Sequence, residues 1–206
     1  MKYKNIIFDV DGTLINTTTA NLLSLQEALI LDGKREYSFN ELMAYDGLPG
    51  KNTLEIIGVS DIEVIHKKWL QLTEHRRYMF EVYYGIHPTL KTLKSSVANL
   101  SIVTSRSNNE VASDMTLNGL ISLFDIIVTS DLTEKHKPNP EPLLYAIEKG
   151  HYLPSETLYV GDSVYDFKAA CGANIAFAKA LWGLKTFDIR VQDYALKQPL
   201  DLLKIL

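Results

Sequence analysis

Short runs of apolar residues recur along the chain, and each is bounded by polar or turn-forming residues. The apolar positions within a run are continuous rather than alternating, which is typical of strands buried on both faces of a sheet. The clearest runs cover residues 5–8, 100–104, 125–129, 157–160 and 174–178. Helical patterns occupy residues 89–96, 108–117, 141–149 and 164–171. This alternation predicts an α/β fold, with a doubly wound, Rossmann-like core built on a parallel sheet.

The alternation is interrupted after the first run. No second strand is expected until about residue 100, whereas residues from about 18 to 79 have the pattern of helices. Helices are expected at residues 19–32, 39–44, 51–57 and 61–79, with breaks at Gly47, Pro49, Gly50 and Gly58. We therefore expect an inserted all-helical domain, residues 17–83, within an α/β core domain formed by residues 1–16 and 84–206. A short terminal helix is expected at residues 201–206.

The composition is that of a soluble globular protein, with 46% hydrophobic and 22% charged residues in 206. Apolar runs fall short of the roughly 18 residues that a membrane-spanning helix needs, so we expect no membrane association. The apolar stretch near the N-terminus is interrupted by Asp9 before it reaches the length of a signal peptide, which favours a cytoplasmic protein. The chain is long enough for one core and one modest insertion, and it leaves monomer and homodimer equally open.

Charge and cysteine content narrow the chemistry. The net charge of −4 argues against nucleic acid as a partner, because phosphate-backbone binding normally requires a basic surface. The basic group at residues 75–77 is the local exception, and it is interpreted either as a solvated helix face or as a site for an anionic substrate. Cys171 is the only cysteine, so a metal bound within one chain must use oxygen or imidazole ligands.

The first apolar run ends at two carboxylates, Asp9 and Asp11, which are followed by Gly12 and Thr13. Ligands of doubly wound sheets bind at the carboxyl ends of the strands, so Asp9 would project into a site. Two acids this close repel each other in a dry cleft unless a cation or a shared proton is present. The alternative is a strand followed by an ordinary Asp-Gly turn, and these residues alone leave both interpretations open.

Two further segments carry groups that suit phosphate. Thr104 ends the run at residues 100–104, where its hydroxyl can donate to a phosphoryl oxygen or can serve a structural role. Lys137 precedes Pro138 and Pro140, which fix the approach to a helix and would hold the lysine before it. An amino group in that position can offset the charge of a phosphate.

A pair of carboxylates follows the run at residues 157–160. Asp162 comes at the end of that strand, and Asp166 lies four residues further on, on the same helix face. Together with Asp9 they would complete an all-oxygen site suited to Mg²⁺. The alternative for Asp162 is a helix cap.

These segments together resemble the four ordered motifs of the haloacid dehalogenase superfamily. The matching residues are Asp9-Val10-Asp11-Gly12-Thr13, Thr104, Lys137-Pro138, and Gly161-Asp162 with Asp166. The resemblance covers nearly the whole chain, because the helical insertion, which returns through residues 83–88, is similar to the helical cap of the phosphoglycolate-phosphatase-like branch. It implies a phosphatase that acts on a small phosphorylated metabolite beneath a helical cap.

The resemblance also implies a role for each motif. Asp9 would attack phosphorus and form an aspartyl-phosphate, while Asp11 would act as proton donor and then as base. Lys137, Thr104 and the backbone N–H of Ser105 would hold the phosphoryl oxygens. The implied ligands of Mg²⁺ are the Asp9 carboxylate, the Asp11 backbone carbonyl, the Asp162 carboxylate and, directly or through water, Asp166.

Residue 11 narrows the reaction, because branches that cleave carbon–halogen or carbon–phosphorus bonds resemble this sequence but lack an aspartate there. Two alternatives to a phosphatase remain. One is a phosphomutase of the β-phosphoglucomutase type, whose cap usually carries a Lys-Gly-x-Ser-Arg-like stretch where this chain has Asp46-Gly47-Leu48-Pro49-Gly50-Lys51. The other is a phosphate-binding regulatory module, which would not need a complete set of nucleophile, acid, lysine and metal ligands.

Specificity is expected to come from the inserted domain, because the core recognises mainly a phosphoryl group. Lys51 follows a glycine-rich and proline-rich loop and is the predicted substrate-binding residue of this domain. Asn16, Tyr45 and Arg76 are weaker candidates, for which a structural or solvent-exposed role is favoured.

Overall fold

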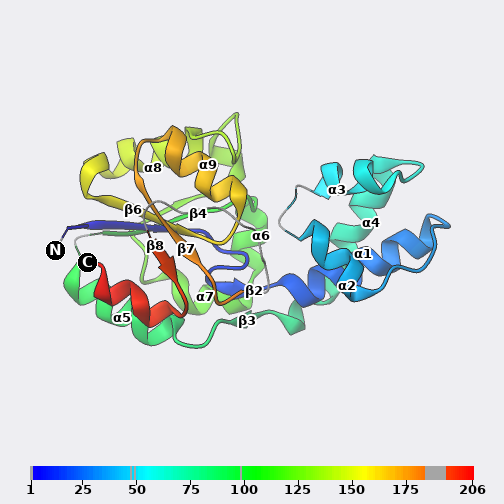
Figure 1. Ribbon diagram of the computed structural model, residues 1–206, viewed down its shortest axis with the longest axis horizontal. Coiled ribbons are helices and arrows are strands. Elements are labelled where there is room, and N and C mark those ends of the chain that lie inside the picture. Colours follow the sequence, from blue (N-terminus) through cyan, green and yellow to red (C-terminus); the bar gives the residue numbers. More distant parts are fainter. Residues whose placement is uncertain (1, 47, 49, 98, 184–193) are drawn as a thin grey trace. The chain divides into compact units, whose positions relative to one another are not determined.

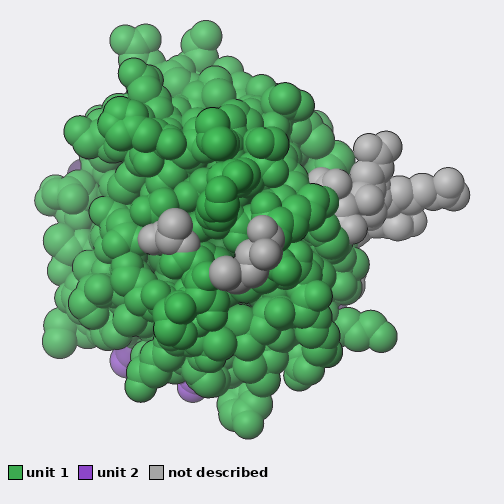
Figure 2. Space-filling view, turned by 90° about the vertical axis from the view of Figure 1, so that its left-hand side faces the viewer, with its two compact units in different colours: residues 1–16, 82–206 green, residues 17–81 purple. Residues whose placement is uncertain are grey.

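The computed structural model describes residues 2–46, 48, 50–97, 99–183 and 194–206. The chain divides into two compact units, which are coloured separately in Figure 2. Unit 1 comprises Met1–Asn16 and Val82–Leu206, and unit 2 comprises Thr17–Glu81. The sequence places the corresponding boundaries after residues 16 and 83. Among the described residues, no helix has the length and apolar character needed to cross a membrane.

Unit 1 is built on a parallel sheet (Figure 1). Among the described residues this sheet has six strands, in the order β5-β4-β1-β6-β7-β8. The strands are β1 Asn5–Phe8, β4 Asn99–Val103, β5 Ile126–Val128, β6 Thr157–Gly161, β7 Ala176–Ala180 and β8 Tyr194–Leu196. The helices of this unit are α5 Ile86–Ser96, α6 Asn108–Ser113, α7 Met115–Ile121, α8 Glu141–Gly150 and α9 Val164–Gly172. Short 3-10 helices are η3 Ser130–Leu132, η4 Pro154–Glu156 and η5 Pro199–Lys204. The predicted α/β fold class is confirmed.

Helices cover both faces of this sheet. In Figure 1, α8 and α9 lie on one face, and α5 and η5 lie on the other. The core on the α8 and α9 side joins Ile7, Val103 and Tyr159 of the strands to Leu143 and Ala169 of the helices. Because β1, β4 and β6 are buried on both faces, their apolar residues form continuous runs, which is the pattern seen in the sequence.

Several element limits differ from the prediction for local reasons. The helix predicted at residues 108–117 is two helices, because Asp114 ends α6 and its side chain caps α7 through Thr116 N and Leu117 N. The last predicted strand begins two residues late, since Asn174 adopts a left-handed conformation (φ 54°) in the turn after α9. The C-terminal helix is the 3-10 helix η5, which starts at Pro199.

The prediction that no second strand precedes residue 100 is wrong. Two-residue strands β2 Ile15–Asn16 and β3 Glu81–Val82 form a small separate sheet. β8 was not predicted either. Strands of two or three residues are too short to produce a recognisable apolar run.

In the part of unit 2 that the structure describes, the regular elements are helices, apart from the first residue of β3. Its elements are α1 Thr18–Leu31, α2 Phe39–Leu42, η1 Met43–Tyr45, α3 Gly50–Ile57, α4 Ile62–His75 and η2 Arg77–Met79. α1 packs against α4 around a core that includes Leu25, Leu29 and Leu72, and the Trp69 indole N–H donates to Asn21 O at 2.9 Å. Gly58 follows α3 with φ 76°, as a helix break requires, whereas Gly50 begins α3. The expected breaks at Gly47 and Pro49 lie outside the described residues.

Candidate active site

Three neighbouring strands of the sheet bring the expected site residues to one edge. β1 pairs with β4 on one side and with β6 on the other, all in parallel. Asp9, Thr104 and Asp162 each follow the last residue of one of these strands, and all three are buried. Because parallel strands end at the same edge, residues more than 150 positions apart in the chain lie together there.

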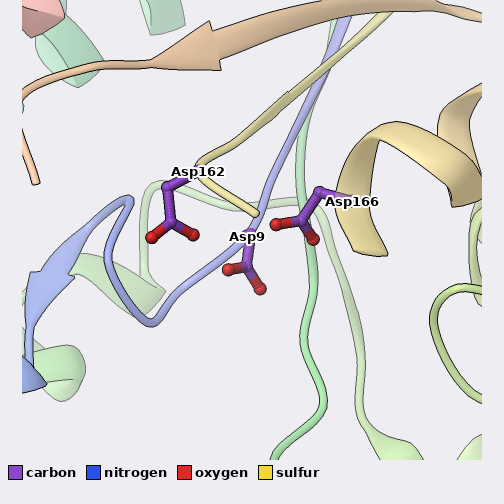
Figure 3. Close-up of side chains that lie close together, drawn as sticks. All are labelled: Asp9, Asp162 and Asp166. Carbon is purple, nitrogen blue, oxygen red and sulfur yellow. The ribbon is translucent and has the colours of Figure 1, made fainter. Parts of the chain in front are cut away.

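The carboxylates of Asp9, Asp162 and Asp166 point toward one another (Figure 3). One oxygen from each lies within 4.8 Å of the others. Three buried carboxylates at this spacing form a set of hard oxygen donors, which divalent cations such as Mg²⁺ prefer. The residues present therefore fit the metal that the sequence predicts.

Gly12 makes room for this cluster. Its backbone has φ 82°, a conformation that side chains disfavour, and a Cβ placed there would lie 2.0 Å from Asp162 Oδ2. The turn after β1 is held by hydrogen bonds to Val10 O from the N–H groups of Thr13, Leu14 and Ile15. The loop is thus more than an Asp-Gly turn, because its glycine lies directly against the Asp162 carboxylate of the buried cluster.

Lys137 joins two of the carboxylates. Its Nζ donates to Asp9 Oδ1 at 2.6 Å and to Asp166 Oδ1 at 2.7 Å, and it lies 3.0 Å from the Tyr159 hydroxyl. The segment that holds Lys137 leads through Pro140, the N-cap residue of α8. The lysine is therefore buried between two anionic side chains of the cluster.

Tyr159 is a member of the site that the sequence prediction missed. It is fully buried in β6, and its hydroxyl lies 2.8 Å from Asp166 Oδ1. A tyrosine inside a strand looks like an ordinary core residue, and its apolar neighbours conceal the polar tip. The available signal is its position three residues before Asp162, on the strand that leads into the site.

Burial and charge act against each other on the ionisable groups. Burial raises the pKa of Asp9 to about 7, because the positive charge of Lys137 does not outweigh burial together with Asp166, Asp162 and Asp11. Burial acts to lower the pKa of Lys137, yet the charges of Asp166 and Asp9 raise it above its usual value. The lysine stays protonated, while the site carries more carboxylates than one lysine neutralises.

The helix after Asp162 has its own cap. The Ser163 side chain accepts from Asp166 N, and Asp166 Oδ2 accepts from Ser163 N at 3.0 Å, which completes a capping box. The alternative that Asp162 caps α9 is therefore wrong. The Asp166 carboxylate is held at both oxygens, and its pKa is lowered because Lys137, Ser163 and Tyr159 together outweigh the effect of burial.

The segment after β4 contributes the remaining groups of unit 1. The Thr104 hydroxyl oxygen accepts from Arg106 N at 3.2 Å, which leaves its proton to donate, and Ser105 is exposed. Arg106 was not predicted, but its guanidinium binds the Asp11 carboxylate. The signal for it is its position two residues beyond Thr104 at a strand end.

The predicted residues of unit 2 have partners within that unit. Lys51 is exposed and its Nζ donates to Glu63 Oε1 at 2.6 Å. Arg76 contacts Glu27 at 2.6 Å and Ser24 Oγ at 3.3 Å, which agrees with the structural role favoured for it.

The family model of the haloacid dehalogenase-like hydrolases matches residues 6–180. A protein of Bacillus mycoides named pyrophosphatase PpaX is 32% identical over 210 residues, which cover 100% of this chain and 98% of the relative. A protein of the same name from Bacillus thuringiensis strain Al Hakam is 30% identical and covered over 97% of its length.

Solved structures of other proteins have a similar fold. A protein of Lactobacillus plantarum whose crystal structure is described as that of a phosphoglycolate phosphatase is 29% identical, with a TM-score of 0.90 and full coverage of both chains. A haloacid dehalogenase-like protein of Bacteroides fragilis shares the fold, with a TM-score of 0.87 at 24% identity, over 98% of this chain and 100% of that one. The chain therefore belongs to the haloacid dehalogenase-like hydrolases. It is an enzyme of the phosphatase type within that family, as the sequence motifs predict.

Proposed function

We propose that this enzyme is a Mg²⁺-dependent phosphatase that hydrolyses a small phosphorylated metabolite through an aspartyl-phosphate on Asp9. The observation that carries this proposal is the convergence of three buried carboxylates and Lys137 at the carboxyl edge of the sheet. Mg²⁺ bound by Asp9, Asp162, the Asp11 backbone carbonyl and, directly or through water, Asp166 supplies the positive charge that an anionic nucleophile and an anionic ester need.

The chain's own residues then divide the chemistry. Asp9 attacks phosphorus in line, so that a bond from its carboxylate oxygen forms as the bond to the leaving oxygen breaks. Asp11 gives a proton to the leaving oxygen, and afterwards accepts one from the water that attacks the phosphoryl group. Thr104, the backbone N–H of Ser105 and Lys137 hold the phosphoryl oxygens while negative charge develops on them.

The substrate is proposed from the names of the relatives. The names of the relatives refer to pyrophosphate and to phosphoglycolate. Both compounds are small anions that carry a phosphoryl group and a second anionic group. We propose a substrate of this class, selected by unit 2 acting as a cap. Lys51 is our candidate for contact with the second anionic group, for which it would exchange its ion pair with Glu63.

The test is phosphate release from a panel of small phosphorylated compounds with Mg²⁺ and with a chelator. Pyrophosphate and phosphoglycolate head the panel, and a phosphopeptide and sugar phosphates complete it. We expect Mg²⁺-dependent release and, after acid quench, a phosphate adduct on Asp9 detected by mass spectrometry. Conversion of one sugar phosphate into its isomer would identify a mutase, and binding without turnover would identify a regulatory module.

Two other outcomes bear on the details of the proposal. A phosphate adduct on a serine would rule out Asp9 as the nucleophile, and faster turnover of the phosphopeptide than of every small compound would exclude a metabolite phosphatase. The cytoplasmic location and the choice between monomer and homodimer remain predictions from the sequence.

A further inference from the structure

Arg106 and Asp11 form a two-point ion pair at the edge of the site. Arg106 Nε donates to Asp11 Oδ2 at 2.8 Å, and Nη2 donates to Asp11 Oδ1 at 2.7 Å. Two parallel hydrogen bonds between a planar guanidinium and a carboxylate fix the plane of the carboxylate as well as its distance. Asp11 is the residue to which the proposed function gives both proton transfers.

The arginine is itself held from the side away from Asp11. Its Nη1 donates to Asp114 Oδ2, and the other oxygen of Asp114 caps α7 by accepting from Thr116 N and Leu117 N. The backbone of Arg106 is fixed as well, because its carbonyl accepts from Ser130 N at 2.9 Å. The positions of α7 and of the end of β4 therefore determine where the guanidinium lies.

Exposure indicates which partner sets the position of the other. The side chain of Arg106 is 9% exposed and that of Asp114 is 2% exposed, whereas that of Asp11 is 38% exposed. Burial acts to lower the pKa of Arg106, but the charges of Asp11 and Asp114 raise it, so the guanidinium keeps its charge. A buried cation that is held by Asp114 thus binds the more exposed carboxylate of Asp11 at both oxygens.

We infer that Arg106 is a positioning residue for Asp11, which keeps the proton donor and base at a fixed place beside Asp9. This inference rests on the proposed function. Arg106 itself gains and loses no proton. With both oxygens accepting from Arg106, Asp11 is held as the carboxylate that takes a proton from the attacking water in the second step. To protonate the leaving oxygen in the first step, Asp11 must already carry a proton on one of these oxygens, and one hydrogen bond to Arg106 is then given up while the other keeps the carboxyl in place. A displaced Asp11 would slow the steps that need this proton transfer and would spare those that do not.

The test uses two substrates that differ in their need for a proton donor. An alkyl phosphate has a poor leaving group that must be protonated, whereas p-nitrophenyl phosphate releases a stable phenolate without help. For both, kcat/KM reports formation of the phosphoenzyme. In Arg106→Met we expect kcat/KM for the alkyl phosphate to fall about 10- to 100-fold, a part of what acid–base catalysis supplies. For p-nitrophenyl phosphate we expect a change of less than about threefold.

Two further variants separate positioning from a structural effect. Arg106→Lys keeps the charge but cannot form two parallel hydrogen bonds, so it should recover only part of the alkyl phosphate activity. In an Asp11→Asn background, Arg106→Met should cause no further loss, because the residue it positions is already disabled. Lys94→Met is the matched control, since it removes another ion pair of unit 1, with Asp125 at 2.6 Å, away from these residues.

Folding is monitored by thermal unfolding. If Arg106→Met does not fold, Asp114→Asn replaces it, because asparagine still caps α7 while it weakens the anchor of Arg106. In this variant, too, we expect kcat/KM to fall more for the alkyl phosphate than for p-nitrophenyl phosphate, by a smaller factor than in Arg106→Met. If Arg106→Met lowers kcat/KM equally for both substrates, or lowers it as much in the Asp11→Asn background as in the wild type, the positioning role is wrong. The proposed function would still stand. A wild-type enzyme that releases phosphate from neither ester would overturn the proposed function, and this inference with it.

Discussion

The pKa of Asp9 is set by burial and by neighbouring charges that act in opposite directions. Its carboxylate accepts a hydrogen bond from Lys137, yet burial and three neighbouring carboxyl groups raise its pKa to about 7. The metal-free site is therefore destabilised by its own charge at neutral pH. A bound cation would relieve that repulsion, and removal of the Asp9 charge should relieve part of it too.

Asp9→Asn should thus abolish turnover while it stabilises the metal-free protein. The loss of the nucleophile should reduce kcat by at least roughly a thousandfold. The pKa rises from 3.8 to about 7 on folding, so the folded state holds this proton more tightly. Wild-type stability should therefore fall as pH rises from about 4 to about 7, and it should be lowest above that range.

Thermal unfolding in a chelator, from pH 4 to pH 8, compares the two proteins. The midpoint of Asp9→Asn should exceed that of the wild type by a margin that grows with pH. Parallel curves would show that Asp9 is not destabilised in the folded protein.

Gly12 provides a second prediction at this scale, because its missing side chain leaves room for Asp162. Gly12→Ala should lower Mg²⁺ affinity about 10- to 100-fold, the range seen when groups that orient metal ligands are lost. Gly33→Ala is the matched control, since Gly33 also has a positive φ (72°), but a Cβ added there meets no described residue within 4 Å beyond its neighbours in the chain. Backbone strain of about 1 to 2 kcal/mol is common to both variants.

Mg²⁺ affinity is measured from the dependence of the unfolding temperature on metal concentration. Gly33→Ala should be less stable than the wild type but should bind Mg²⁺ equally well. Equal Mg²⁺ affinity in Gly12→Ala and the wild type would refute the role assigned to the glycine.

At this scale the sequence predicts residues whose type and place reveal their chemistry. Asp9, Asp162 and Asp166 are polar residues at or just beyond apolar runs, and the structure brings them together. Tyr159 and Arg106 could not be assigned in this way. The role of Tyr159 depends on a hydrogen bond from its hydroxyl to Asp166 on the following helix, and that of Arg106 depends on partners 95 and 8 residues away.

At the scale of elements, the long apolar runs of the core strands and the amphipathic helices could be predicted to within a few residues. The predictions that failed concerned very short strands, or a helix boundary that is set by a single side chain. Asp114 divides one helix into two by offering its carboxylate to the N–H groups of α7, which an apolar pattern does not record. Strands as short as β2 and β3 arise from tertiary pairing and leave no periodic signal.

The pairing of α1 with α4 gives a prediction of its own. Trp69 is 5% exposed between these helices and donates its indole N–H to Asn21 O. Trp69→Ala should lower the free energy of unfolding of unit 2 by about 3 to 5 kcal/mol, because it leaves a large cavity. Trp69→Phe keeps most of the packing and loses the hydrogen bond, which is worth about 1 kcal/mol.

Chemical denaturation followed by circular dichroism measures both variants. Exposed Leu70, the neighbour of Trp69 on α4, serves as the control, since Leu70→Ala leaves no buried cavity. A cost for Trp69→Ala no larger than that for Leu70→Ala would contradict the packing role.

At the scale of the whole molecule, the chain forms two units, each with its own apolar core. The proposed metal ligands all belong to unit 1. Mg²⁺ should therefore stabilise unit 1 directly, by about 2.7 kcal/mol when its concentration is a hundred times the dissociation constant. In Trp69→Phe, the remaining Trp182 reports on unit 1, and its unfolding midpoint should rise with Mg²⁺ and return with a chelator.

The distribution of tryptophan has one more consequence. The chain has two tryptophans, and each unit holds one of them, Trp69 in unit 2 and Trp182, which donates to Thr13 O, in unit 1. Each fluorophore is thus an intrinsic reporter of a different folding unit, and no label is needed. Reading Trp69 alone in Trp182→Phe while Mg²⁺ is added yields the coupling free energy between the units. That quantity measures how strongly an ion bound in unit 1 affects the stability of unit 2, the unit that we propose selects the substrate.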